Sequence, residues 1–295
     1  MRRVLVYSHD TFGLGNIRRM LAISQALTEA DSAVSVLILS GSPMLHAFRM
    51  PPRIDYVKLP CLARDANGVY GVKYLDLDYQ AALRLRSSLI VSAAIEFAPD
   101  VVLVDKKPLG VDGELEAALD LLGASERRPS VYLILRDILD DPEVTQRIWQ
   151  KHDYHGAIER HYDGVLVAGC PSVFDVAKEY AFPAATRGMT EHVGYLHRCG
   201  GRKTRDGVRA GFDLRGLPLV LVHAGGGGDG APLIEGFIEG LHAREGRAPF
   251  YSWIISGPDM SEPDRERLRH RASPLAHVRF ENFTDDMPSC MEAAD

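Results

Sequence analysis

Short apolar runs alternate with amphipathic stretches along almost the whole chain. Between the apolar runs, apolar residues recur three and four positions apart, and this spacing predicts helices. Strands that alternate with helices favour a parallel sheet with helices on both faces, so the sequence predicts a doubly wound α/β fold. In residues 1–200 the runs that predict strands are Val4–Tyr7, Ala33–Leu39, Asp55–Leu59, Val101–Val104, Val131–Leu135 and Val165–Ala168.

The alternation restarts after residue 216. Residues 201–216 are rich in glycine and arginine and have no apolar period, which predicts a linker. We therefore expect one Rossmann-like domain in residues 1–200 and a second in residues 217–295. The second has only three predicted strands, fewer than a finished domain of this type, so we expect it to be truncated and the chain to be a fragment. Its predicted strands are Leu219–His223, Tyr251–Ile255 and Val278–Phe280.

Composition excludes several classes of protein. The chain has 295 residues, 46% hydrophobic and 25% charged, which is typical of globular domains. A net charge of −6 argues against a general nucleic-acid binder. Its 4 cysteines form no Cys-x-x-Cys pair, which predicts reduced thiols rather than a disulfide framework or a zinc site. No apolar run has the length of a membrane span or the character of a signal peptide, so we expect a cytoplasmic protein.

The most specific candidate site follows the run Leu219–His223. Four consecutive glycines, Gly225 to Gly228, lead through Asp229 and Gly230 to Pro232, which suits the first turn of a helix. Unpaired amides at a helix N-terminus, together with the positive end of the helix dipole, form an anion site. We predict a phosphate site at Gly225, Gly226, Gly227, Gly228 and Asp229. The alternative is a flexible surface turn.

A dinucleotide site is the weaker interpretation of the same glycines. Gly225, Gly227 and Gly230 satisfy the pattern G-x-G-x-x-G. That motif also needs an acidic residue at the end of the next strand to hold a ribose, whereas this strand ends in Ser256-Gly257-Pro258. NAD is therefore not the preferred ligand, and no cofactor is predicted.

The loop after the first predicted strand carries a second candidate. His9 and Asp10 are the residue types most used as general bases, and they precede Gly13, Gly15 and a helix that Asn16 is expected to cap. Hydrogen bonds that only stiffen this loop explain the pair about equally well.

Cations follow two of the other strands. Lys106 and Lys107 come after Val101–Val104, and Arg136 comes after Val131–Leu135. Ligands bind beyond the carboxyl ends of strands in such sheets, so these cations could hold phosphate or an anionic acceptor. A solvated loop and an ion pair with Asp137 are the alternatives.

No metal is predicted. Asp76-Leu77-Asp78 matches a D-x-D pair that holds divalent metals in some sugar-nucleotide enzymes, but three-residue matches are common in a chain with 40 acidic residues. His152, His155 and His161 have no acidic or cysteine partner that completes a ligand set.

Two segments of the second half resemble the GT-B glycosyltransferases. VHAGGGGDGAPLIEGFIEGL is similar to the strand, glycine-rich diphosphate loop and helix of one branch, and ENFTDDMPSCMEAAD to its F-x-D-D-M segment. That branch contains the N-acetylglucosaminyltransferase of the lipid-linked peptidoglycan precursor and the galactolipid synthases. DKKPLG and LRDILDDP in the first half are closer to a group of predicted bacterial glycosyltransferases.

The resemblance implies two Rossmann-like domains in the GT-B arrangement and a hexosyltransferase. It implies a metal-independent, inverting transfer by single displacement from a nucleoside-diphosphate-sugar, UDP above all, to an acceptor hydroxyl. The glycine loop then holds the donor diphosphate, and His9 or Asp10 takes the acceptor proton. The residues expected beside the donor nucleotide are Gly257, Phe283, Thr284 and Met287, and those on the acceptor side are Gly13, Gly15, Asn16, Lys106, Lys107 and Arg136.

The resemblance leaves the partners partly open. A lipid-linked acceptor would bring the protein into peripheral contact with the inner face of the membrane, and no nucleic acid is expected. The family continues after Ala-Asp with a strand and a glutamate that holds the donor, whereas this sequence ends at Asp295. A nucleotide-sugar epimerase or hydrolase, and a non-catalytic nucleotide-sugar-binding regulator, stay as alternative functions.

Overall fold

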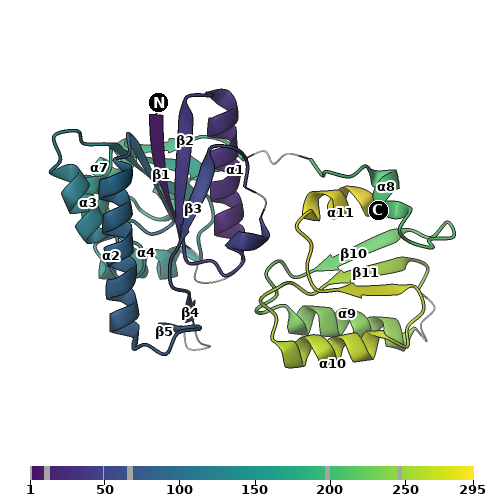
Figure 1. Cartoon of the computed structure of the whole chain (residues 1–295). Coiled ribbons are helices and arrows are strands. Elements are labelled where there is room, and N and C mark those ends of the chain that lie inside the picture. The colour runs from purple at the N-terminus through teal and green to yellow at the C-terminus, as the bar shows by residue number, and fades with distance from the viewer. Residues whose placement is uncertain (1, 10–13, 49, 65–68, 197–199, 245–247) are drawn as a thin grey trace. The chain divides into compact units, whose positions relative to one another are not determined.

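The computed structural model describes residues 2–9, 14–48, 50–64, 69–196, 200–244 and 248–295 (Figure 1). The chain divides into two compact units. Unit 1 comprises residues 1–11 and 16–197, and unit 2 comprises residues 12–15 and 198–295.

Unit 1 is built on a sheet of seven strands in the order β3-β2-β1-β6-β7-β8-β9. Every neighbouring pair in it is parallel. The order runs outward from β1 in one direction and then from β6 in the other, which is the doubly wound order with its switch point between β1 and β6. The strands are β1 (Arg2–Ser8), β2 (Val34–Ser40), β3 (Ile54–Lys58), β6 (Val101–Asp105), β7 (Ser130–Arg136), β8 (Gly164–Ala168) and β9 (Thr190–His192).

Helices cover both faces of this sheet, with α1 on one side and α2 and α3 on the other (Figure 1). Consecutive residues of β1 are buried, as expected of a strand that is covered on both faces. Leu5 and Tyr7 belong to the same core cluster as Ile90 and Ala94 of α2. The helices are α1 (Gly15–Ala30), α2 (Tyr79–Phe97), α3 (Glu116–Gly123), α4 (Pro142–Lys151), α5 (Tyr154–His161), α6 (Val176–Glu179) and α7 (Ala184–Gly188), with a 3-10 turn at Leu45–Ala47.

Three details of unit 1 differ from the sequence-based expectation, and one of them is the edge strand β9, which was not predicted. α1 begins at Gly15, so Asn16 lies in its first turn and the prediction that Asn16 caps the helix is wrong. A small antiparallel hairpin, β4 (Leu62–Arg64) with β5 (Tyr70–Val72), lies after β3. Strands of three residues carry too little pattern to be recognised in the sequence.

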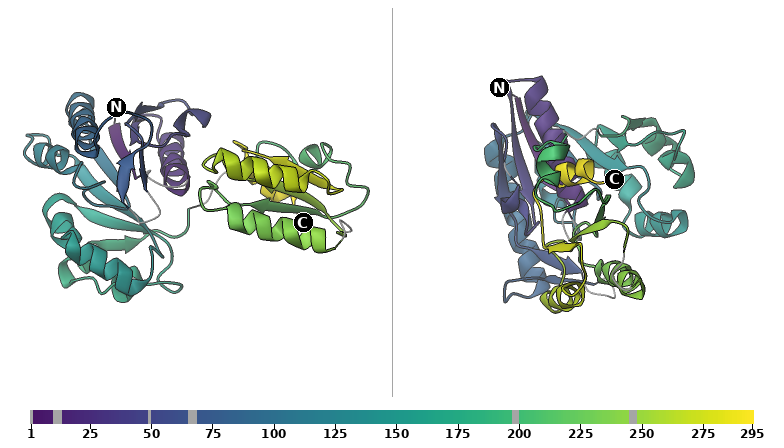
Figure 2. Two further views of the ribbon diagram at one scale, coloured as in Figure 1. Left: turned by 90° about the horizontal axis from the view of Figure 1, so that it is seen from below. Right: turned by 90° about the vertical axis from the view of Figure 1, so that its right-hand side faces the viewer.

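Unit 2 contains a parallel sheet in the order β10-β11-β12. Its strands are β10 (Leu219–His223), β11 (Tyr251–Ile255) and β12 (Val278–Glu281), and its helices are α8 (Arg205–Arg209), α9 (Ala231–Ala243), α10 (Glu262–Ala272) and α11 (Met287–Ala293). α9 and α10 lie side by side on one face, and α8 and α11 on the other (Figures 1 and 2). The three strands match those predicted, to within one residue.

The core of unit 2 is split by the sheet, as alternation along a strand requires. Trp253 and Ile255 of β11 pack with Met287 and Cys290 of α11, whereas Ile254 packs with helices α9 and α10. Residues 201–216, where the sequence predicts a linker, contain α8. Their Arg205 and Arg209 side chains donate hydrogen bonds to carbonyl oxygens at the end of α11.

A buried ion pair ties four segments of unit 1 together. Arg86 of α2 contacts Glu114 through two hydrogen bonds, Nε to Oε2 at 2.5 Å and Nη2 to Oε1 at 2.7 Å. Tyr7 of β1 donates its hydroxyl hydrogen to Glu114 Oε1 at 2.5 Å, and Arg86 also donates to the Pro60 carbonyl at 2.6 Å. Both charged side chains are only 2% exposed. Burying a charged side chain costs free energy, and here each charge is compensated by its partner. Removing one partner would leave the other charge buried and uncompensated, which is strongly destabilising.

Arg86→Met should therefore be strongly destabilising, because it leaves the Glu114 carboxylate buried without its cation. We expect a loss of about 3–5 kcal/mol in the free energy of unfolding. Urea unfolding measures it, with Trp149 as the reporter of unit 1 in a Trp253→Phe background.

The matched control is Arg127→Met, which removes a cation that is 76% exposed and pairs with Asp100. Exposed pairs contribute about 0–1 kcal/mol, so this variant should unfold close to the parent. A loss below about 1 kcal/mol for Arg86→Met would contradict the account of the buried pair.

Candidate functional site

The glycine turn lies between the end of β10 and the start of α9. It is folded by two internal hydrogen bonds, from Gly227 N to Ala224 O at 3.0 Å and from Gly230 N to Gly227 O at 3.1 Å. Gly225 and Gly227 have φ of 60° and 89°, a region that glycine enters without steric cost. The turn therefore needs glycine for its own shape.

The glycine turn packs directly on the turn that follows β11. A Cβ atom on Gly227 would lie 2.1 Å from the Ser256 carbonyl oxygen, and one on Gly257 would lie 2.4 Å from Gly226 O. Asp259 N donates to Gly226 O at 2.7 Å. The two turns thus meet backbone to backbone, with no room for a side chain at Gly227 or Gly257.

Gly230 has a third role. A Cβ atom there would lie 2.2 Å from the Ala224 Cβ, so glycine lets α9 begin close to the end of β10. This is the role of the last glycine in G-x-G-x-x-G turns. The pattern in the sequence therefore reflects real packing.

The turn presents amide hydrogens for which the described part of the chain supplies no acceptor. Within the described residues, the backbone N–H groups of Gly226, Gly228 and Asp229 donate to no acceptor. Gly228 and Asp229 are exposed, and they directly precede the first turn of α9, where Pro232 sits. Amides of this kind beside a helix N-terminus can bind an anion.

His223 is a neighbour that the sequence analysis did not single out. It ends β10, and its Nδ1 accepts a hydrogen bond from Gly225 N at 3.4 Å. A histidine at the end of an apolar run gives no signal of this contact in the sequence.

Three of the four residues predicted beside the donor nucleotide lie just before α11 or at its first position. Phe283 and Thr284 are half-buried, and Thr284 Oγ1 accepts from Asp286 N at 3.1 Å. Asp286 caps α11 and also accepts from Arg202 N at 3.3 Å. Met287 is only 7% exposed and packs in the core, so its side chain anchors the segment from within rather than lining the surface.

In unit 1, His9 directly follows β1, beside the switch point. The His9 side chain is 2% exposed, and its carbonyl oxygen accepts from Asn16 Nδ2 at 2.5 Å. Arg19 of α1 continues the network, donating to Asn16 Oδ1 at 2.9 Å and to Asp105 Oδ1 at 2.5 Å. The structure therefore brings together the ends of β1 and β6 through the first turns of α1.

Asp105 is the buried end of this network. Burial raises the pKa of the Asp105 carboxyl, and the Arg19 guanidinium and the His9 backbone amide oppose that rise. The sequence suggested no role for Arg19, because an arginine on an amphipathic helix is usually solvated.

The predicted residues Asp10 and Gly13 lie outside the described residues, and Gly15 has no heavy atom within 4 Å of where its Cβ would be.

The predicted acceptor-side cations separate into two groups. Lys106 follows β6 with φ of 68°, and burial together with the nearby Arg136 guanidinium lowers the pKa of its ammonium. Lys107 instead donates to the Tyr70 hydroxyl at 3.1 Å and lies over that ring. The structure therefore brings Lys106 and Arg136 together and directs Lys107 to β5.

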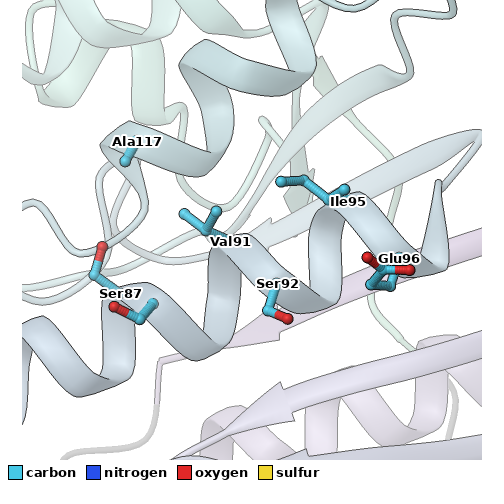
Figure 3. A pocket seen from close by; sticks show the side chains of 7 residues that line it. Ser87, Val91, Ser92, Ile95, Glu96 and Ala117 are labelled. Carbon is cyan, nitrogen blue, oxygen red and sulfur yellow. The ribbon is translucent and has the colours of Figure 1, made fainter.

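Other candidate features lie apart from these residues. Among the described residues, no three histidine, cysteine, aspartate or glutamate side chains are grouped as a metal site would require. An open groove of about 480 Å³ lies between α2 and α3, away from the strand ends (Figure 3). None of the helices in the described part of the chain has both the length and the apolar character needed to cross a bilayer.

No protein-family model matches the chain, and no curated protein matches its sequence. Solved structures do match it in fold. HepE (Alr3699) from Anabaena in complex with UDP-glucose has 14% identity and a TM-score of 0.55, covering 100% of this chain and 72% of that one. A glycosyltransferase from Rickettsia africae has 10% identity and a TM-score of 0.56, covering 100% and 71%. The calicheamicin glycosyltransferase CalG4 has 12% identity and a TM-score of 0.51, covering 99% and 77%.

Identities of 10–14% show the fold and nothing finer. They confirm the resemblance and the fold class that the sequence predicts. The chain therefore has the α/β fold of the GT-B glycosyltransferases, with a Rossmann-like sheet in each of its two units.

Proposed function

We propose that the chain is a glycosyltransferase that moves a sugar from a nucleoside-diphosphate-sugar, with UDP as the nucleotide, to an acceptor hydroxyl. The observation that carries the proposal is the glycine turn of unit 2. Its amides at Gly226, Gly228 and Asp229 belong to a tightly packed turn, yet they have no acceptor among the residues that the structure describes. The fold adds support, because HepE was solved with UDP-glucose and with UDP.

The three amides would bind the donor diphosphate. During transfer the bond from the anomeric carbon to the phosphate oxygen breaks, and its electron pair leaves with the diphosphate. Fixed N–H dipoles stabilise that developing charge without reorganising, which is the main contribution of preorganised sites. The reaction we propose is metal-independent, with Gly257, Phe283 and Thr284 beside the nucleotide and Met287 anchoring their segment.

The acceptor side would lie at the carboxyl ends of β1, β6 and β7. The acceptor oxygen forms the new bond to the anomeric carbon from the face opposite the diphosphate, so the configuration inverts. Its proton passes to His9, or to Asp10 as the alternative base. Asn16 and Arg19 hold the His9 backbone in place for this step.

The remaining predicted residues would line the acceptor. Lys106 and Arg136 are the cations we propose for an anionic group, and Lys107, Gly13 and Gly15 stay proposed acceptor-side residues. A lipid-linked acceptor, with a cytoplasmic protein in peripheral contact with the membrane, stays part of the proposal.

Isothermal titration of the chain with UDP, UDP-sugars and dTDP-sugars tests the donor site. We expect UDP and at least one UDP-sugar to bind at one site per chain, and dTDP-sugars to bind more weakly. Absence of binding by all three groups, with a native circular dichroism spectrum, would remove the donor site from the account.

Gly227→Ala should disrupt the diphosphate site, because there is no room for the new Cβ atom. The new Cβ would approach the Ser256 carbonyl oxygen to 2.1 Å at a φ of 89°, so the two turns must separate. We expect UDP affinity to fall by roughly tenfold or more, equivalent to about 1.4 kcal/mol or more of binding free energy.

The matched control is Gly236→Ala in the interior of α9, where no heavy atom lies within 4 Å of the new Cβ. UDP binding should be unchanged there, and the free energy of unfolding should rise by about 1 kcal/mol, since alanine is the better helix former. Equal UDP binding by both variants and the wild type would contradict a site at the turn.

Replacing His9 by Gln together with Asp10 by Asn separates catalysis from binding. Loss of a general base lowers turnover by roughly 10²–10⁴-fold, whereas UDP affinity should stay within about twofold. Steady-state kinetics beside UDP titration measures both. Unchanged turnover would exclude both residues as the base.

Product analysis without acceptor distinguishes the alternative functions. Free sugar or an epimerised sugar nucleotide would favour a hydrolase or epimerase. Tight donor binding with no product under any condition would favour a non-catalytic nucleotide-sugar-binding regulator. Transfer that needs an acceptor hydroxyl supports the proposal.

A further inference from the structure

One cation of unit 2 is buried beneath the candidate site. Arg265 of α10 is 8% exposed, whereas Arg267 on the same helix forms ion pairs on the surface with Glu235 and Asp264. Burying a guanidinium is costly unless its N–H groups find acceptors. The contacts of the Arg265 guanidinium therefore indicate its role.

The Arg265 guanidinium holds the backbone of the turn after β11. Its Nη2 donates to Met260 O at 2.8 Å and lies 3.3 Å from Gly257 O and 3.4 Å from Pro258 O. Its Nη1 forms an ion pair with Glu262, three residues earlier on α10. A planar, forked donor can hold several carbonyl oxygens at once, and a single side-chain ammonium cannot do this with the same geometry.

The turn that Arg265 holds is the surface on which the glycine turn rests. Asp259 N donates to Gly226 O at 2.7 Å, and the Cα of Gly257 lies 3.1 Å from where a Gly227 Cβ would be. A shift of residues 257–260 therefore moves Gly226 and Gly227 directly. Arg265 is therefore linked to the Gly226 backbone indirectly, through the turn at residues 257–260.

We propose that Arg265 is a positioning residue for the diphosphate site. By fixing the turn at residues 257–260, it fixes the Gly226 backbone and with it the direction of the exposed amides. This inference rests on the proposed function for the identity of the ligand, and on the contacts above for the mechanical link. It assigns α10, which carries none of the predicted site residues, a role in donor binding.

Hydrogen–deuterium exchange without ligand tests the mechanical link. Arg265→Met should speed exchange of the Gly257 and Asp259 amides by about tenfold or more, because their turn loses its brace. Arg267→Met removes the same charge from the same helix and should leave that exchange within about twofold of wild type. Unchanged exchange in Arg265→Met would overturn the inference, whatever the ligand.

Titration with UDP and with UMP tests the link to the diphosphate. We expect Arg265→Met to weaken UDP binding by about tenfold and UMP binding by clearly less, because only UDP carries the second phosphate. Arg265→Lys keeps the charge without the fork and should stay about fivefold or more weaker than wild type for UDP. Equal losses for UDP and UMP would mean a general structural role and would overturn the inference.

These outcomes are separable from failure of the proposed function. If the wild-type chain binds neither UDP nor UMP, the donor-site proposal fails, and the exchange experiment still decides whether Arg265 braces the turn. If Arg265→Met does not fold, the comparison of Arg265→Lys with Arg267→Lys applies the same criteria.

Discussion

The turns after β10 and β11 touch backbone to backbone, and this contact governs the arrangement of the candidate donor site. Gly227 and Gly257 cannot carry a Cβ atom where the two turns meet. Because Gly227 N–H and Gly230 N–H are used inside the turn, the amides that remain are those of Gly226, Gly228 and Asp229. The same backbone geometry thus packs the glycine turn against the turn after β11 and directs its remaining N–H groups toward a ligand. Arg265 extends the same constraint from α10 to the turn.

Unit 1 uses its buried charges in a different way. Arg86 and Glu114 satisfy each other in the core, and Arg19 is committed to Asp105 at the switch point. Burial and the like charge of Arg136 lower the pKa of the Lys106 ammonium, and the Asp105 carboxylate opposes that shift. An anionic group between the ends of β6 and β7 would relieve that repulsion.

The repeating pattern of the sequence was sufficient to predict both parallel sheets except the short edge strand β9, since apolar runs and helical spacing are local signals. It also predicted the strand, glycine turn and helix of unit 2. It could not show that packing requires glycine at Gly227, Gly230 and Gly257. These glycines pack against Ser256, Ala224 and Gly226 respectively, and such contacts form only when the chain is folded.

The roles of Arg19 and Arg265 were not predicted. Both depend on contacts that join separate elements, and arginines on helices resemble solvated residues in the sequence. Met287 is predicted beside the nucleotide from a motif, and the packing adds that its side chain faces the core. The glycine- and arginine-rich composition of residues 201–216 indicated a linker, whereas Arg205 and Arg209 use their charges to dock α8 on the end of α11.

The central claim is that the exposed amides of the glycine turn bind a diphosphate. The most direct measurement is an amide chemical-shift titration of the uniformly nitrogen-15-labelled chain with UDP. The account predicts that the largest shifts occur at Gly226, Gly228 and Asp229, and that they saturate together with those of Phe283 and Thr284. Saturable binding whose largest shifts lie elsewhere, or no shift at any of these amides, would contradict it.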